Sequence, residues 1–128
     1  MALVGVGIDA IEISRVRDAV VRTPGLLARL FTERERGSCV TRCGDLRYGG
    51  LAARFAGKEA VAKALGTGVR GFDFRDIEIL NDELGKPAVI LHRGAAATAA
   101  ELGVSKVHLS LSTSTEIAMA NAVAETSS

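Results

Sequence analysis

The 128 residues of this chain are enough for one hydrophobic core but not for two independent ones. Hydrophobic residues make up 48% and aromatic residues 4%, so the core must be mostly aliphatic and rich in alanine. No apolar stretch reaches the length of a membrane span, and the apolar start of the chain has no basic leader. We therefore expect one cytoplasmic domain over residues 1–126 with no membrane partner. A small alanine-rich domain often hides apolar surface in an oligomer, so we also expect a homo-oligomer.

The first third of the chain predicts a strand followed by short helices. Residues 3–8 are an apolar run that predicts a strand ending at Asp9. Residues 13–22 have apolar side chains at helical spacing, and residues 26–30 predict a second short turn. Thr32-Glu33-Arg34-Glu35 has the pattern of a capping box, which predicts a helix start at Thr32.

The middle of the chain contains the strongest helix pattern. Residues 51–65 are rich in Ala and Leu, and we expect this helix to follow a loop at Gly49-Gly50. Gly66-Thr67-Gly68 predicts the C-terminal end of the helix. The two cysteines, Cys39 and Cys43, have no neighbouring His or Cys that would complete a zinc site, so we expect both to be reduced.

The last third predicts mostly strands. Two short strands, at 77–80 and 88–91, flank a turn and form a hairpin, and an alanine helix follows at 94–102. Residues 107–112 alternate between polar and apolar types, as a half-buried strand does. The alanines of residues 116–125 favour a helix, but the spacing of the larger apolar residues favours a strand, which we predict. These elements indicate an α+β domain.

The charge distribution is more informative than the net charge of +1. Seven arginines lie between Arg15 and Arg42, opposed by few acidic residues. A basic face of this kind suits an anionic partner, although a solvated helix face would have the same composition.

Most catalytic templates are absent from the sequence. It has no GxxxxGK[ST] loop, no GxSxG elbow and no complete dinucleotide fingerprint. His92 and His108 lie in segments that we predict as strands, without a second histidine at metal-binding spacing, so we assign neither a catalytic role.

Two carboxylates, Asp9 and Glu59, stand in unusual positions. Asp9 follows an apolar strand, and Glu59 lies in the middle of the alanine-rich helix, so the two can converge across a short gap. Mg²⁺ needs only one or two carboxylates, because water and phosphate oxygens complete its coordination. Two ordinary roles remain open: Asp9 could cap the following helix, and Glu59 could pair with Lys63 four residues on.

Cations on the same helix favour the metal interpretation. Arg54 and Lys58 are four residues apart, and Lys63 follows Glu59 by four. Like charges at this spacing cost stability unless an anion lies between them, and a phosphate-rich ligand bridged by a metal would supply that anion. The glycines of Gly66-Thr67-Gly68 would let a ligand approach the backbone closely. The residues alone therefore suggest a domain that binds Mg²⁺ and a polyphosphorylated ligand.

Two spaced motifs carry a resemblance to a known family. Gly5-Val6-Gly7-Ile8-Asp9, followed by Glu12-Ile13 and Arg15, resembles the opening motif of the holo-acyl-carrier-protein synthases. Residues 54–68, RFAGKEAVAKALGTG, closely resemble their second motif, (F/W)xxKExxxK. Residues 31–35 and 81–87 also match family segments. The similarity runs in order over nearly the whole chain.

The resemblance implies a small single-domain phosphopantetheinyl transferase, with a small antiparallel sheet packed against a long helix. It implies homotrimers with an active site at each subunit interface. It also implies that the 4'-phosphopantetheine group moves from coenzyme A to a serine of an acidic acyl carrier protein and that adenosine 3',5'-bisphosphate leaves. Neither nucleic acid nor membrane is an expected partner.

The resemblance also implies a role for each site residue. Asp9, Glu59 and Lys63 would be catalytic, and Asp9 and Glu59 would hold Mg²⁺. Arg15 falls at the family's carrier contact, and Arg22 lies seven residues on, on the same helical face. The implied coenzyme A contacts are Arg54, Lys58, Lys63, Gly66, Gly68 and Thr113.

One residue departs from the family pattern. Many members carry SxSH near the C-terminus, whereas this chain has Ser110-Leu111-Ser112-Thr113, with Thr113 in the place of the histidine. Two other functions remain open from the sequence: a Mg²⁺-dependent nucleotide or pyrophosphate hydrolase, and a non-catalytic module that binds coenzyme A or a carrier domain.

Overall fold

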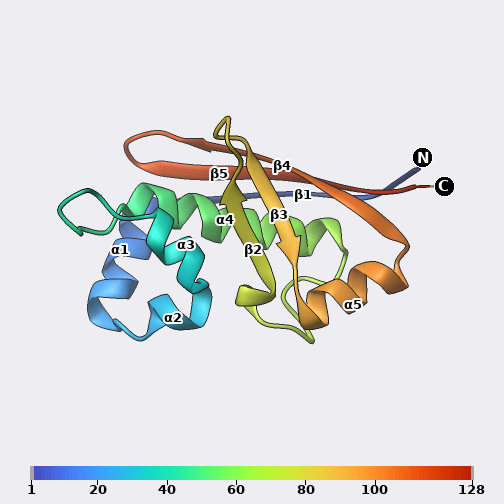
Figure 1. Cartoon of the computed structure of the whole chain (residues 1–128), viewed down its shortest axis with the longest axis horizontal. Coiled ribbons are helices and arrows are strands. Elements are labelled where there is room, and N and C mark those ends of the chain that lie inside the picture. The colour runs from blue at the N-terminus through green and yellow to red at the C-terminus, as the bar shows by residue number, and fades with distance from the viewer. Residues whose placement is uncertain (1, 128) are drawn as a thin grey trace.

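The structure is a computed structural model that describes residues 2–127. It contains two separate antiparallel sheets and one long helix, α4 (Figure 1). In chain order the elements are β1 (Ala2–Glu12), α1 (Ile13–Arg22), α2 (Leu26–Leu30), α3 (Glu33–Ser38), α4 (Tyr48–Ala64), a 3-10 helix η1 (Phe74–Asp76), β2 (Ile77–Asn81), β3 (Pro87–Leu91), α5 (Arg93–Glu101), β4 (Val104–Thr113) and β5 (Ile117–Thr126).

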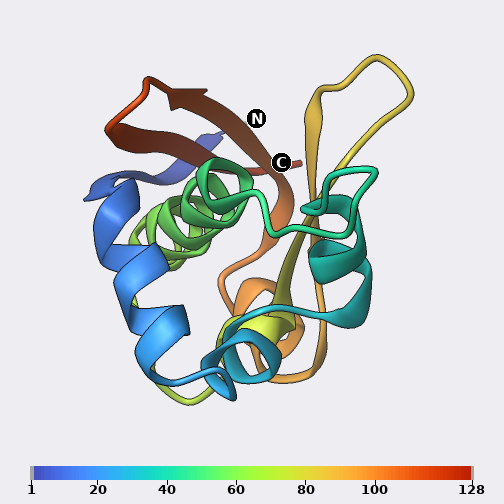
Figure 2. The same ribbon diagram turned by 90° about the vertical axis from the view of Figure 1, so that its left-hand side faces the viewer.

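The larger sheet has the strand order β1-β5-β4, and the smaller sheet is the β2–β3 hairpin. Helix α4 lies between the three-stranded sheet and this hairpin (Figure 2). Because α4 packs on both sides, most of its residues are buried, which makes it a core helix rather than a surface helix. The face of β5 that contacts α4 presents four buried alanines, Ala118, Ala120, Ala122 and Ala124. Their small side chains allow the helix and the sheet to approach closely.

Several predicted elements are confirmed. Helix α1 covers residues 13–22 as its spacing predicts, and the hairpin has its strands at 77–81 and 87–91. The capping box is present, because the Thr32 hydroxyl accepts from the Glu35 amide at 3.2 Å and the Thr32 amide donates to Glu35 Oε1 at 2.9 Å. The ambiguous last segment is a strand, β5, which pairs on both sides with β1 and β4.

Three local predictions are wrong. Strand β1 does not end before Asp9 but continues to Glu12, because its pairing with β5 continues to Ile117. Gly49-Gly50 is not a loop but part of the first turn of α4, where a Cβ at Gly50 would lie only 3.1 Å from Cys39 Sγ. His92 is not in a strand but precedes α5 as its N-cap residue.

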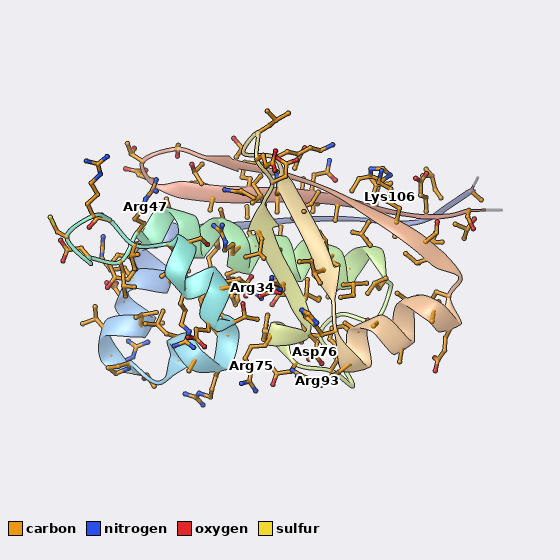
Figure 3. The ribbon with its side chains drawn as sticks, viewed as in Figure 1. Arg34, Arg47, Arg75, Asp76, Arg93 and Lys106 are labelled. Carbon is orange, nitrogen blue, oxygen red and sulfur yellow. The ribbon has the colours of Figure 1, made fainter. Side chains whose placement is uncertain are left out.

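A buried carboxylate, Glu78 of β2, ties three parts of the chain together. Its side chain is 2% exposed and accepts hydrogen bonds from Thr32 and Arg34, and His92 Nε2 lies 3.1 Å from Oε1. Burial alone would raise the pKa of Glu78, but these hydrogen bonds outweigh it and lower the pKa to about 2. Figure 3 labels Arg34 within this cluster.

Acid should therefore destabilise the fold through Glu78. The folded pKa of about 2 lies below the ordinary value of 4.5, so the charged carboxylate stabilises the fold above pH 4.5. This contribution is lost as the pH falls from about 4.5 to about 2. We expect Glu78→Gln to be less stable than wild type at pH 7 and the difference to shrink across this window, as measured by urea unfolding at a series of pH values. A difference that stays constant down to pH 2 would contradict this assignment.

Candidate active site

Asp9 lies on the face of β1 that α4 covers. Its strand position pairs with Ala120 of β5, one of the alanines that face α4. The Asp9 side chain is 20% exposed, so it is partly shielded but reachable by a ligand. Asp9 therefore faces α4, the helix that carries Glu59, as the sequence predicts. It does so from within the strand rather than from its end.

Lys63 bridges from α4 to β1. Its Nζ donates to the backbone carbonyl of Ile8 at 2.9 Å and to Asp9 Oδ1 at 3.2 Å. Half of the Lys63 side chain is exposed, so the ammonium lies at the surface and can also contact a ligand. Glu59 lies one turn before Lys63 on the same helix.

The electrostatics place Glu59 beside the same two groups. Its pKa is raised first by burial and then by the charge of Asp9, while Lys63 opposes both. A carboxylate whose pKa is raised by a second carboxylate lies where a cation would be stabilised. Within residues 2–127, no group of three or more His, Cys, Asp or Glu side chains could enclose a metal ion. A two-carboxylate site suits Mg²⁺, which keeps several water ligands, and it does not suit a closed structural zinc site.

The protein contacts of Lys58 argue against its predicted phosphate contact. Its side chain is fully buried, and Nζ donates to Glu35 Oε1 at 2.8 Å, to the carbonyl of Phe74 at 2.9 Å and to the carbonyl of Ile77. A lysine has three N–H donors, and all three are used here. Lys58 therefore has no donor left for a phosphate, and it joins α4 to α3 and β2 instead.

Helix geometry explains why the predicted cation cluster is divided. Each residue turns the helix by about 100°, so Lys58 and Lys63 point in directions about 140° apart. Lys58 faces α3 and β2, whereas Lys63 faces β1. The two lysines cannot contact one phosphate group within one chain.

Arg54 lies on the Lys58 side of α4. It is 5% exposed, and its guanidinium donates to the carbonyls of Ile79 at 3.0 Å and Gly50 at 3.3 Å. Arg54 nevertheless lines a pocket of about 370 Å³, together with Arg47 and Thr113. Two of the predicted coenzyme A contacts, Arg54 and Thr113, are thus brought together, away from Asp9 and Glu59.

Comparison with known proteins identifies the family. A family model described as the 4'-phosphopantetheinyl transferase superfamily matches residues 5–122. The chain is 48% identical over 127 residues to a holo-[acyl-carrier-protein] synthase of Clostridium perfringens, covering 96% of this chain and 94% of that protein. This chain belongs to the 4'-phosphopantetheinyl transferase superfamily.

Solved structures of other superfamily members have the same fold. The holo-[acyl-carrier-protein] synthase of Neisseria meningitidis is 34% identical, with a TM-score of 0.87 over 97% of this chain and 99% of that one. A holo-(acyl-carrier-protein) synthase of Bacillus anthracis, in complex with CoA (3',5'-ADP), is 38% identical, with a TM-score of 0.79 over 98% of both chains. The predicted α+β fold of this phosphopantetheinyl transferase is thereby confirmed.

The remaining predicted residues lie at the edges of the site. Gly66 and Gly68 end α4, where their amides donate to the carbonyls of Lys63 and Ala62, and both have positive φ angles. Their predicted contact with coenzyme A stays a prediction. Arg15 and Arg22 are both exposed on α1, and seven residues of helix bring them to within about 20° of the same direction.

Sequence reasoning missed Arg47. This exposed residue precedes α4 as its N-cap and lines the same pocket as Arg54 (Figure 3). Arg47 lies at the end of a loop with no periodic pattern. The only sequence signal for a ligand site there is the nearby Gly49-Gly50 pair. The hairpin residues Asn81, Gly85 and Pro87 also line this pocket.

Proposed function

We propose that this chain transfers the 4'-phosphopantetheine group of coenzyme A to a serine hydroxyl of an apo-acyl carrier protein, as a holo-[acyl-carrier-protein] synthase. One observation carries the proposal: Asp9, Glu59 and Lys63, from β1 and α4, form one charged cluster in a chain of the phosphopantetheinyl transferase superfamily. The relatives of known name are holo-[acyl-carrier-protein] synthases along nearly their full length, which supports the same activity here.

In the proposed reaction, the serine oxygen attacks the β-phosphorus of the coenzyme A pyrophosphate. The new bond joins serine to the phosphopantetheine phosphate, and the bond to adenosine 3',5'-bisphosphate breaks. Mg²⁺ held by Asp9 and Glu59 would neutralise charge on the pyrophosphate oxygens. Lys63 Nζ, which is half exposed beside Asp9, would donate to a phosphate oxygen as negative charge builds. The serine proton would pass to the Glu59 carboxylate or to a neighbouring water.

We assign the nucleotide end of coenzyme A to the pocket that contains Arg47, Arg54 and Thr113. Exposed Arg47 supplies a cation for a phosphate, and the exposed Thr113 hydroxyl supplies a hydrogen bond where many family members have histidine. This pocket and the Asp9–Glu59 cluster lie on opposite sides of α4. We therefore propose that a complete site combines the pocket of one subunit with the carboxylates of another.

The face of the three-stranded sheet opposite α4 supports a homotrimer. Leu3, Val6, Ile8 and Met119 are large apolar residues on this face, between 44% and 71% exposed. Monomeric proteins seldom expose so many large apolar side chains in one place, so a second copy of the chain is the proposed cover.

A charge on this sheet face should disrupt the assembly. We expect Ile8→Lys to shift the protein from about three times its 13.4 kDa chain mass to a single chain mass in sedimentation equilibrium. Val21→Lys is the matched control, because Val21 is similarly exposed, at 67%, but lies on α1. A trimer that survives Ile8→Lys would exclude this face as the interface.

The exposed arginines of α1 are the proposed docking site for the acidic carrier protein. Charge reversal by Arg15→Glu and Arg22→Glu together should raise the KM for the carrier by at least about tenfold, while kcat at saturating carrier changes little. The effect should weaken with added salt. Lys106→Glu is the control, because Lys106 is exposed on β4 at the other end of the molecule from α1 (Figures 1 and 3). Equal KM changes in both variants would rule out a specific α1 site.

The activity itself is tested by mass spectrometry of apo-carrier proteins incubated with the chain, coenzyme A and Mg²⁺. A gain of one phosphopantetheine group is expected, and it should be lost when the metal is chelated. Release of adenosine bisphosphate without a carrier would instead indicate a hydrolase. We propose a single cytoplasmic domain over residues 1–126 that acts without nucleic acid or membrane. As a separate finding, the helices within residues 2–127 include none that could span a membrane.

A further inference from the structure

Strand β1 approaches α4 so closely that only glycine fits at two positions. A Cβ added at Gly7 would lie 1.9 Å from the carbonyl oxygen of Ala60, and one at Gly5 would lie 2.1 Å from that of Ala64. Real Cβ atoms essentially never approach another heavy atom closer than 3.0 Å. The opposing atoms belong to the backbone of α4, so no side-chain rotation can relieve either contact.

The Gly7 contact lies directly beside the two carboxylates. Gly7 and Asp9 are two residues apart on the same face of β1, and Ala60 follows Glu59 in α4. The distance between strand and helix at this point is therefore also the distance across which Asp9 and Glu59 must share an ion. The contact between the Ala60 carbonyl oxygen and Gly7, which has no side chain, sets that distance.

A magnesium ion would be sensitive to this spacing. Its oxygen ligands lie at 2.0–2.1 Å, and a working site holds each distance to within about 0.2 Å. Any side chain at position 7 would have to move β1 away from Ala60 by about 1.5 Å to reach an ordinary van der Waals contact at 3.4 Å. A displacement of that size is several times larger than a shared ion tolerates.

We propose that Gly7 is a positioning residue, whose missing side chain sets the separation of the Asp9 and Glu59 carboxylates to the span of one divalent cation. The proposal rests on the proposed function, because it takes this pair as the metal site. Gly57 of α4 offers a contrast. A Cβ there would meet the ends of the Ile79, Leu109 and Leu111 side chains, which can move without shifting the backbone.

The test measures the binding of Mn²⁺ alone to the full chain, by the loss of the free-ion signal in electron paramagnetic resonance. Gly7→Ala should weaken Mn²⁺ binding at least about tenfold, while circular dichroism shows the same fold. Gly37→Ala is the control, because a Cβ at that position would meet no other part of the described structure within 4 Å beyond its own helix turn, and its Mn²⁺ affinity should equal that of wild type.

A rescue separates positioning from general damage. Asp9→Glu lengthens the side chain by one methylene, so it should weaken Mn²⁺ binding in the wild-type chain but strengthen it in the Gly7→Ala chain, where the gap is wider. Should Gly7→Ala not fold, the same pair of measurements is made with Gly5→Ala, whose contact lies one turn further along α4 and whose effect should be smaller.

The possible outcomes are distinct. Unchanged Mn²⁺ binding in Gly7→Ala, or an Asp9→Glu effect of the same sign in both chains, would overturn the positioning role while leaving the metal site in place. If Asp9→Asn binds Mn²⁺ as tightly as the wild-type chain does, Asp9 is not a metal ligand. That result would overturn the metal site of the proposed function and the positioning role of Gly7 together.

Discussion

Replacing Glu59 with Gln should lower turnover at least about a hundredfold while leaving the fold intact. The substitution keeps the size of the side chain but removes its negative charge and its basicity. A neutral amide binds Mg²⁺ far less well than a carboxylate and cannot accept the serine proton. Among residues 2–127, no side chain forms an ion pair with Glu59, so thermal unfolding should change little. The measurement is the initial rate of holo-carrier formation, followed by mass.

A matched control makes this result specific. Glu101→Gln removes the same charge from an exposed position on α5, and it should keep the wild-type rate. Restoring the rate of Glu59→Gln by raising the Mg²⁺ concentration would assign Glu59 mainly to the metal. Failure of extra Mg²⁺ to help would assign it mainly to proton transfer. A Glu59→Gln enzyme with the wild-type rate would leave only a binding role for this chain.

Replacing Lys58 with Met should be among the most destabilising single changes, because it breaks a fully buried ion pair. Glu35 would keep its hydrogen bonds from the amides of Ile79 and Thr32, but it would lose the one cation that bonds to it within the described part of the chain. An uncompensated buried charge costs about 3–5 kcal/mol. Burial already lowers the pKa of Lys58, against the opposing effect of Glu35, so the pair depends on its mutual contact.

Removing the charge of Glu35 as well should restore part of the stability. In the double variant Lys58→Met/Glu35→Gln no buried charge is left unpaired, so part of the lost unfolding free energy should return. Urea unfolding measures both variants, and Lys106→Met, at an exposed site, is the control. Turnover per folded molecule of Lys58→Met should stay within about tenfold of wild type. A stable Lys58→Met protein with greatly reduced coenzyme A affinity would restore the phosphate contact that the sequence suggested.

The sequence predicted the elements that local chemistry determines. The capping box at Thr32 and the apolar spacing of α1 are short-range patterns, and both elements form as predicted. Gly49-Gly50 was misleading because glycine often indicates a loop, whereas here it lets the first turn of α4 pack against Cys39. Tertiary packing decided that position, and the local pattern could not show it.

The site was predictable only in part, for a reason that lies in α4. The convergence of Asp9, Glu59 and Lys63 follows from a strand and a helix with suitable side chains. The direction of Lys58 does not follow, because a helix buried on nearly all sides has no apolar stripe from which its orientation could be read. The partner of Lys58 is Glu35, 23 residues away, and no sequence pattern connects them.

Anomalous scattering of Mn²⁺, in crystals of the protein grown with coenzyme A, would show directly whether Asp9 and Glu59 share one ion on the pyrophosphate. The predicted result is a single strong peak near each active site, with carboxylate oxygens of Asp9 and Glu59 and oxygens of the pyrophosphate all within coordination distance. A peak bound to neither carboxylate, or to only one of them in every subunit, would contradict the account.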